Sequence, residues 1–340
     1  MDEREARPTM YTVASHAGVS IATVSRVLAG DRRVREQTAR RVLASAEAVG
    51  YRLNGAARAL ATQRHGTIGV VFPNLSGPYY AGVILGLEEA ASALGQSVII
   101  AGTQGRPGSE ELVLDLATKV DGLVLFGRTV PDAMVEELAG RRVPVVLLAR
   151  PQVGSAATVR AENRRSAGAL TAHLFGHGHE RIAFVGDPDS SPDAAERWQG
   201  YLDAHRAAGM DAPALPDVCP FREADGRRAA GLALRRRPAP TALLCANDEI
   251  AMGAYAAAAA RGVAVPGDVA ITGWDDIAAG RFLAPPLTTV RQPLAELGSR
   301  AAAALQAAIE GGAGEGETLA TTLVIRESCG CTAAEALSID

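Results

Sequence analysis

A short stretch between positions 20 and 26 carries side chains whose types and spacing suit contacts with DNA bases. These side chains fall on one face of a helical pattern: Ser20, Ile21, Ala22, Ser25 and Arg26. Short side chains let such a helix enter the major groove deeply, where an arginine fork binds the O6 and N7 of guanine and an apolar side chain contacts a thymine methyl. The same face also fits an ordinary surface helix, so these residues alone leave both interpretations open.

The elements that would position this face are two helical patterns that meet at Gly18. Apolar residues line the inner side of both patterns: Val13, Ala14 and Ala17 before the glycine, and Val19, Val24, Val27 and Leu28 after it. Glycine permits the sharp turn of a helix-turn-helix, and the Ser20 hydroxyl can cap the second helix. A third amphipathic helix is predicted over 36–49. Its inward residues are expected to be Val42, Leu43, Ala46 and Val49.

Charge is distributed unevenly along the chain. The net charge is −4, yet residues 1–65 contain 11 arginines and 6 acidic residues while the remainder is strongly acidic. A basic head on an acidic body concentrates phosphate attraction at one end. Because Lys119 is the single lysine, phosphate contacts are expected to come from arginine, hydroxyl groups and backbone amides.

Composition and apolar runs limit the classes of protein to which this chain can belong. A chain of 340 residues with 48% hydrophobic and 21% charged residues is typical of soluble globular proteins with more than one folded unit. The N-terminus lacks the apolar region of a secretory signal, and no apolar run is long enough for a membrane span, so we expect a cytoplasmic protein.

Four cysteines are present, and none has a strong chemical signature. Cys219 and Cys245 each stand alone and are expected to be buried thiols. A metal or redox role is open to the pair in Cys329-Gly330-Cys331, but no nearby histidine pair completes a zinc set. The sequence therefore predicts no metal site and no cofactor.

The body of the chain alternates short apolar runs with helical patterns. Thr67–Phe72 reads as a strand buried on both faces, and a helix is predicted from Tyr79 to Leu94. Further strands are predicted near 97–102, 121–126, 144–149, 181–186, 241–246 and 269–273. Such alternation predicts parallel sheets. Breaks near 161–163 and 291–293 divide the body into two similar halves.

These motifs together resemble the LacI/GalR (lactose-repressor) family. The head carries Val19–Leu28, Gly50-Tyr51, Asn54 and Ala57-Arg58-Ala59-Leu60, and the body carries Ile68–Asn74, Gly176–Ile182, Ala246–Asp248, Gly273–Asp276 and Pro286–Val290. The resemblance runs from about residue 9 to about 328. It implies an all-α helix-turn-helix headpiece plus hinge helix, followed by an α/β periplasmic-binding-protein-like body of two Rossmann-like subdomains.

The resemblance also implies domain boundaries. The headpiece covers 1–52, the hinge helix and linker 53–65, and the effector-binding and dimerisation domain 66–340. The N-subdomain takes about 66–162 and 293–324, and the C-subdomain about 163–290 and 325–340. The head departs from the family pattern at several positions: Thr12 replaces an acidic residue, Arg35 a Ser or Thr cap, and Leu53 a common proline beside Gly55.

For the head, the resemblance implies a set of DNA contacts: Thr9, Met10, Ser20, Ile21, Ala22, Thr23, Ser25, Arg26, Asn54, Ala57, Arg58 and Leu60. The hinge would fold only on DNA, and Leu60 would wedge into the minor groove and kink a base step. The implied partner is a double-stranded operator, near-palindromic with a central C-G step, bound by a homodimer. The tail after Cys331 lacks the leucine heptads of a tetramer-forming bundle.

For the body, ligand contacts are expected at the carboxyl ends of the strands, where open parallel sheets bind their ligands. Residues after the first strand are Asn74, Ser76, Tyr79 and Tyr80, and the resemblance adds Asp193, Arg197, Phe221, Asn247, Asp275 and Gln292. These residue types suit a neutral, hydroxylated ligand such as a sugar. A nucleoside stays open because of the aromatics, and Arg150 with Arg197 would tolerate a phosphorylated or acidic sugar.

The leading hypothesis is therefore a sequence-specific transcriptional regulator, a homodimeric repressor whose operator affinity is changed by a small ligand. Induction and co-repression use the same parts, and the sequence does not choose between them. A sugar- or nucleoside-binding protein without transcriptional switching is the alternative. An enzyme is not expected, because G-x-G-x-x-G after a strand, Walker A and G-x-S-x-G motifs are absent. His177 and His179 precede a strand, which is the wrong end for a ligand cleft.

Overall fold

The computed structural model describes residues 8–28, 33–51, 64–73, 75–103, 106–211, 215–312, 314–332 and 335–339. Contacts divide the chain into two compact units, residues 1–67 with 118–121, and residues 68–117 with 122–340. The candidate contacts Asn54, Ala57, Arg58 and Leu60 of the predicted hinge, and the candidate ligand contact Asn74, lie outside the described residues.

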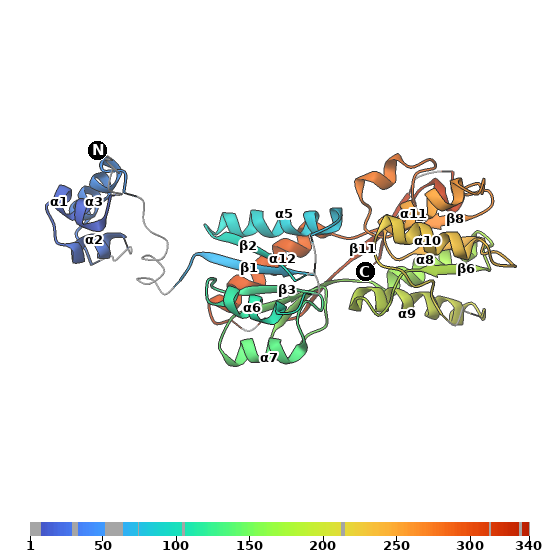
Figure 1. Cartoon of the computed structure of the whole chain (residues 1–340), viewed down its shortest axis with the longest axis horizontal. Helices are drawn as coiled ribbons and strands as arrows, with labels where there is room; N and C mark the ends of the chain where they lie inside the picture. Colours follow the sequence, from blue (N-terminus) through green and yellow to red (C-terminus); the bar gives the residue numbers. More distant parts are fainter. Residues whose placement is uncertain are drawn as a thin grey trace. The chain divides into compact units, whose positions relative to one another are not determined.

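The first unit contains the three predicted helices of the head (Figure 1). They are α1 (Met10–Ala17), α2 (Ile21–Leu28) and α3 (Glu36–Ala48). Their shared core consists of Val13, Ala14, Ala17, Val24, Val27, Val42 and Ala46. Gly18 ends α1 with φ 61° and ψ 42°, a left-handed conformation that glycine adopts without steric cost.

The inward side chains of α3 differ at one position from the prediction. Leu43 was expected to face the core and is 54% exposed, so that prediction was wrong. The buried stripe instead contains Val42, Ser45 and Ala46. These three positions follow the i, i+3, i+4 spacing of one helix face, and Leu43 lies about 100° around the helix from Val42.

Hydroxyl caps define the starts of α1 and α2. Thr9 and Thr12 form a reciprocal capping box, so the threonine that replaces an acidic residue still satisfies the helix start. Ser20 Oγ accepts from the Thr23 amide at 3.1 Å, as the sequence predicted. Arg35 precedes α3 and makes no side-chain cap.

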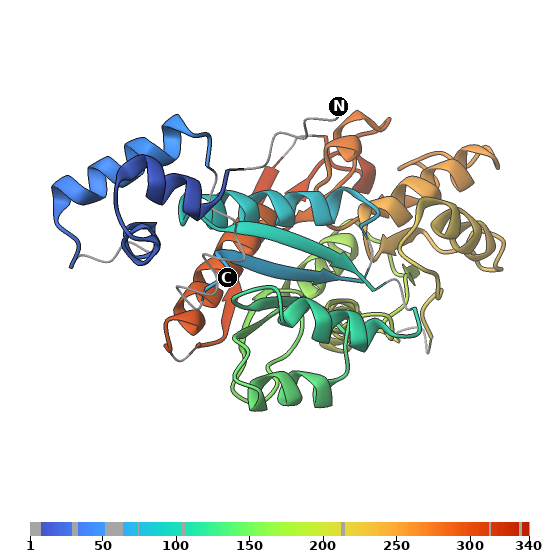
Figure 2. The ribbon, with the colours of Figure 1, turned by 60° about the vertical axis from the view of Figure 1, so that its left-hand side comes forward.

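The second unit begins with a six-stranded sheet in the order β10-β5-β4-β3-β1-β2. Its strands are β1 (Thr67–Phe72), β2 (Ser97–Gly102), β3 (Leu123–Phe126), β4 (Val145–Leu148), β5 (Ala157–Ala161) and β10 (Glu317–Leu319). The covering helices are α5 (Pro78–Ala93), α6 (Ser109–Ala117), α7 (Asp132–Gly140) and α12 (Leu294–Ile309). Figures 1 and 2 show α5 and α12 on one face and α6 and α7 on the other. We call this layer the N-subdomain.

The C-subdomain is built around the parallel sheet β6-β7-β8. Its strands are β6 (Ile182–Val185), β7 (Ala242–Cys245) and β8 (Ala270–Thr272). Its helices are α8 (Arg164–Gly176), α9 (Pro192–Ala207), α10 (Glu223–Ala233), α11 (Asp248–Ala259) and the short η1 (Ala278–Phe282). Helices α8 and α9 pack together, as do α10 and α11 (Figure 1). A continuous apolar core fills the space between them.

An antiparallel ribbon of β9 (Thr289–Arg291), β11 (Thr321–Ile325) and β12 (Glu335–Ile339) completes the body, with η2 (Glu327–Cys329) after β11. The chain passes between the subdomains after β5, β9 and β10. Buried hydrogen bonds tie two of these crossings together: Ser166 Oγ lies 2.6 Å from Thr321 Oγ1 and donates to Glu162 Oε2 at 2.8 Å. The predicted strands all exist, but β5 and β9 to β12 were not predicted.

Candidate functional site

The exposed face of α2 presents the side chains that the sequence singled out for base contacts. Ser20, Ala22 and Arg26 are exposed, and Thr23 and Ser25 are half-buried. Ile21 is half-buried and packs against the head core, so only part of its side chain is available to a ligand. No described residue pairs with the Arg26 guanidinium, which leaves its donor fork open to a base or a phosphate.

In the body, residues that follow different strands converge at the ends of the two subdomain sheets. Tyr79 and Tyr80 begin α5 after β1, and Asp193 and Arg197 lie in the first turns of α9 after β6. Burial raises the pKa of the Tyr79 hydroxyl, and the charges of Asp193, Asp275 and Arg197 also act on that pKa. We call Tyr79, Tyr80, Asp193, Arg197, Asp275 and Gln292 the junction cluster.

Arg197 is the fixed cation of the junction cluster. It is 5% exposed, and its Nε donates to Asn163 Oδ1 at 2.8 Å while its Nη1 donates to the Ala246 carbonyl at 2.7 Å. Its guanidinium carbon lies 4.5 Å from the centre of the Trp274 ring, a cation–π distance. These contacts hold the guanidinium plane in place.

Two buried carboxyl groups share this site. Burial raises the pKa of Asp275 to about 7 although Arg197 and Gln292 oppose the shift, and burial raises the pKa of Asp193 to about 6 against the effect of Arg197. Asp275 has φ 112°, a conformation that non-glycine residues rarely adopt and that clusters at functional sites.

Gln292 lies in the crossing after β9 and contacts the Asp275 carboxyl group of the C-subdomain. Its Nε2 donates to Asp275 Oδ1 at 2.6 Å. Its Oε1 is buried and has no hydrogen-bond partner among the described residues. Buried polar atoms are nearly always paired in folded proteins, so this oxygen stands out among the buried polar atoms of the site.

The two tyrosines form the aromatic side of the cluster. Tyr80 packs edge-on against Phe72 and Phe126, and Tyr79 packs edge-on against Phe126 and Tyr80. Burial raises the pKa of Tyr80 to about 12. Both rings are therefore fixed by packing within the N-subdomain, and the charges of Asp193 and Asp275 contribute to raising the pKa of both hydroxyls.

Other candidate residues take different positions. Ser76 is exposed, and Phe221 packs against the C-subdomain core. Asn247 is buried, and its Oδ1 caps α11 through the Ile250 amide at 2.9 Å. Arg150 is bound to Asp132 and to the Val130 carbonyl, so the expectation that it would accommodate an acidic sugar is not supported by its contacts.

Sequence reasoning missed two residues of this region. Asn163 is fully buried and orients Arg197. In the sequence it lies in the break at 161–163, which indicated a boundary between the two halves but no role for this side chain. Glu249 acts on the Tyr80 hydroxyl, and its position in the first turn of a helix gave no signal.

The expectation about the C-terminal cysteines was also wrong in one respect. The sequence shows no histidine pair near Cys329-Gly330-Cys331, but the fold brings His173 and His177 into contact with both thiols. Sequence separation hides this neighbourhood, because the histidines and cysteines are more than 150 positions apart.

Comparisons with known proteins identify the two parts of the chain separately. Residues 9–54 match the model of bacterial regulatory proteins of the lacI family, and residues 171–329 match the periplasmic binding protein-like domain. The HTH-type transcriptional repressor CytR of Escherichia coli K12 is 34% identical over 306 residues, which cover 88% of this chain and 89% of that protein.

The chain belongs to the LacI family of bacterial regulatory proteins. This LacI-family protein is therefore a DNA-binding transcriptional regulator, as its sequence predicted. It is also 32% identical to catabolite control protein A of Priestia megaterium, over 86% of this chain and 89% of that protein.

Solved structures agree with the fold of this LacI-family regulator. The lac repressor dimer bound to operator and an anti-inducer superposes with a TM-score of 0.83 at 28% identity, covering 95% of this chain and 99% of the other. The complex of the transcriptional regulator CelR with cellobiose gives a TM-score of 0.72 at 32% identity, covering 95% and 100%. Among the described residues, no helix has the length and apolar character that a membrane crossing requires.

Proposed function

We propose that this LacI-family regulator is a homodimeric repressor whose affinity for a near-palindromic operator is changed by a neutral, hydroxylated ligand, most simply a sugar. The ligand would bind at the junction cluster between the two subdomains. The observation that carries the proposal is a buried arginine, fixed by Asn163 and the Ala246 carbonyl, beside two buried carboxyl groups and a Gln292 oxygen that no described residue pairs with.

Sugar hydroxyls match these groups because each hydroxyl both donates and accepts. Asp193, Asp275 and Gln292 Oε1 would accept from ligand hydroxyls, and Arg197 would donate to the oxygens of a vicinal pair. Tyr79 and Tyr80 would cover an apolar sugar face. The cellobiose complex of the similar CelR regulator supports this ligand class. A nucleoside is the second candidate, favoured by the same two aromatic rings.

For the head, we propose that α2 reads the major groove through Ser20, Ala22, Ser25 and Arg26, with Ile21 and Thr23 at its edge. Thr9 and Met10 at the start of α1 would contact the backbone beside it. The hinge residues Asn54, Ala57, Arg58 and Leu60 would bind the minor groove at a central C-G step. The operator-bound dimer of the similar lac repressor supports this assignment.

Dimerisation would use the N-subdomain. Large apolar side chains are exposed on α5, on the residue that ends it, and on β2 and α6: Leu85, Leu94, Ile99, Ile100 and Leu112. Exposed apolar groups of this kind mark interaction surfaces when they lie on neighbouring elements. A dimer through this surface would place two copies of α2 on two half-sites.

The proposed switch couples the ligand to the crossings between the subdomains. A ligand bound to both halves would shift their relative position, and this change would reach the hinge at 53–65. The free energy for this shift must come from different affinities of the ligand for the two relative positions of the subdomains. Induction and co-repression differ only in the sign of this coupling. We infer no enzymatic activity and a cytoplasmic location, in line with relatives that are transcriptional regulators.

A paired assay tests this function. Sugars and nucleosides are screened for thermal stabilisation of the full chain, and each hit is added to an operator-binding measurement with a palindrome that has a central C-G step. The expected hit raises the melting temperature and changes operator affinity. A hit that stabilises the protein at saturation without altering operator affinity would contradict the switch, and no preference in a random-oligonucleotide selection would contradict operator recognition.

A further inference from the structure

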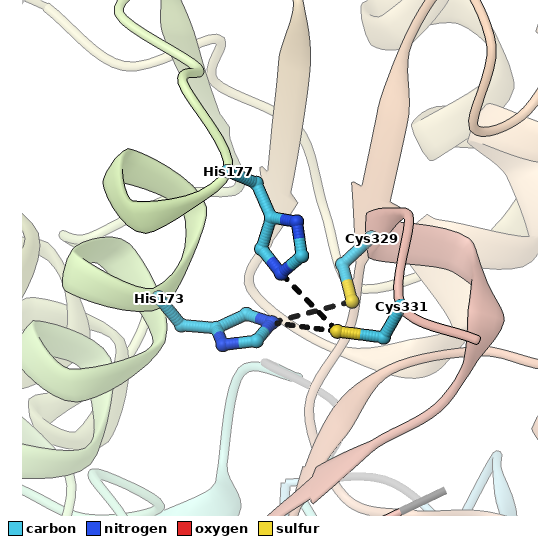
Figure 3. Close-up of side chains that lie close together, drawn as sticks. All are labelled: His173, His177, Cys329 and Cys331. Atoms are coloured by element: carbon cyan, nitrogen blue, oxygen red, sulfur yellow. Dashed lines mark hydrogen bonds between the residues drawn. The ribbon is translucent and has the colours of Figure 1, made fainter. Parts of the chain in front are cut away.

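A four-residue cluster of histidine and cysteine lies in the C-subdomain outside the junction cluster. His173 is in the last turn of α8 and His177 caps its end, while Cys329 and Cys331 follow β11. Figure 3 shows both imidazole rings pointing toward the two sulfur atoms. His177 precedes β6, so the cluster lies at the amino ends of the strands, away from the effector residues at their carboxyl ends.

The nitrogen–sulfur separations across the cluster are close to those of a metal tetrahedron. His173 Nε2 lies 3.3 Å from Cys329 Sγ and 3.8 Å from Cys331 Sγ, and His177 Nε2 lies 3.1 Å from Cys331 Sγ. Zinc–nitrogen and zinc–sulfur bonds at tetrahedral angles put nitrogen and sulfur about 3.6 Å apart. All four atoms lie within 4.8 Å of one another, so small rotations of the side chains would complete the site.

Local structure on each side holds these atoms in place. The i, i+4 spacing puts His173 and His177 on one face of the helix end, with their ring centroids 4.7 Å apart. Gly330 between the cysteines has φ 100°, which glycine adopts freely and which turns both thiols to the same side. Cys329 is fully buried, and Thr288 Oγ1 donates to its sulfur at 3.2 Å.

We propose that His173, His177, Cys329 and Cys331 bind one Zn²⁺ ion that joins the end of α8 to the segment after β11. Two thiolates and two neutral imidazoles form a closed set of four protein ligands, which is the pattern of structural rather than catalytic zinc. Binding would release the two thiol protons and leave the ion with no open position. Soft sulfur with imidazole selects zinc over magnesium or calcium.

The site would stabilise the C-subdomain by fixing its C-terminal segment. This segment carries Ser328, whose Oγ donates to the Ile271 carbonyl at 2.5 Å and accepts from the Thr288 amide at 2.8 Å. The segment is therefore already hydrogen-bonded to β8. An ion that binds only the folded arrangement adds its binding free energy to folding.

The test uses the full chain purified without a metal-affinity step and in the presence of a thiol reductant. Metal content is measured by mass spectrometry, and Co²⁺ is substituted to read the coordination from visible and near-ultraviolet absorption. We expect one zinc per chain, a tetrahedral Co²⁺ spectrum with thiolate charge transfer, and a chelator-induced fall in melting temperature on the order of 5 °C or more.

The double variant His177→Gln with Cys331→Ser replaces two ligands that are not buried, an exposed histidine and a half-buried cysteine. Its fold is therefore expected to survive. It should hold less than a tenth of the wild-type zinc, because it keeps two of the four ligands and because losing even a second-shell partner of a ligand lowers metal affinity by roughly 10–100-fold. The matched controls are Cys219→Ser and His65→Gln, which lie outside the cluster and should keep one zinc per chain. Substoichiometric zinc in wild-type protein, unchanged zinc in the double variant, or a Cys329–Cys331 disulfide under reducing conditions would each overturn the site.

Discussion

Arg26 of the head and Arg197 of the body are two arginines proposed to bind ligands, and they do so from opposite starting points. Arg26 stands exposed on α2 with no partner among the described residues, so its side chain must be ordered when DNA binds. Arg197 is 5% exposed and already donates two hydrogen bonds to Asn163 and Ala246. Binding to Arg197 therefore costs little side-chain entropy.

This difference separates the energetics of the two sites. Contacts of an exposed arginine with DNA are screened by salt and contribute modestly at each position. The charges of the junction cluster act in a region of low water content, where removing one partner leaves the others buried and unpaired. We therefore expect the loss of Arg197 to have a larger effect on ligand binding than the loss of Arg26 has on DNA binding.

The largest effect is expected for Arg197→Ala. Loss of the guanidinium should weaken binding of the sugar that stabilises the wild type best by about 2–5 kcal/mol, since Asp193 and Asp275 lose their cation. Operator binding without ligand should remain. Isothermal titration calorimetry measures the change. Arg206→Ala is the control, because this exposed arginine lies on the same helix and pairs with Asp203; equal losses in both variants would refute a specific role of Arg197.

Next in size is Arg26→Ala in the head. Loss of the fork should reduce discrimination for guanine at one half-site position by about 1–3 kcal/mol and relax specificity there. Fluorescence anisotropy with single-base operator variants measures it. Arg40→Ala, an exposed arginine paired with Glu36 on α3, should leave that preference intact. A loss of the same size on every sequence would instead identify Arg26 as a phosphate contact.

A smaller, pH-dependent effect is expected for Asp275→Asn. Burial raises the pKa of Asp275 to about 7, so the folded body binds a proton that the unfolded chain has released. Between roughly pH 4 and pH 7, this group makes stability fall as pH rises, by up to about 1.4 kcal/mol per pH unit. The asparagine cannot titrate, so its stability should fall less steeply over this window.

Urea unfolding of wild type and variant at several pH values checks the sign. Asp193→Asn should flatten the same dependence at lower pH, because burial raises the pKa of Asp193 only to about 6. Parallel stability curves for Asp275→Asn and wild type would show that the buried carboxyl group does not titrate in this range.

The smallest effect is expected for Ser20→Ala at the start of α2. Removing the hydroxyl that accepts from the Thr23 amide should destabilise the helix start by about 1 kcal/mol. Hydrogen exchange of the Thr23 amide reports it locally. In the control variant Ser15→Ala, which lies within α1, the Thr23 amide should be as protected as in the wild type. Unchanged exchange at Thr23 in Ser20→Ala would show that the cap does not stabilise the helix start.

The sequence by itself determined the parts of this protein whose signals are local. Apolar spacing around Gly18 defined the helix-turn-helix, and the continuous apolar runs defined β1 to β4 of the N-subdomain sheet and all three strands of the C-subdomain sheet. Strands β9 and β10 were not predicted from the sequence, because each has only three residues and lies beside a crossing between the subdomains. Leu43 was misplaced because an apolar residue next to a buried stripe looks the same as one inside it.

Only the tertiary structure decided which distant side chains meet. Asn163 orients Arg197, and Gln292 contacts Asp275, because the crossings bring the ends of several strands together. His173 and His177 face Cys329 and Cys331 across more than 150 positions. Helix and strand periodicity records which side of an element faces inward, but not what lies opposite, because that depends on how the elements pack.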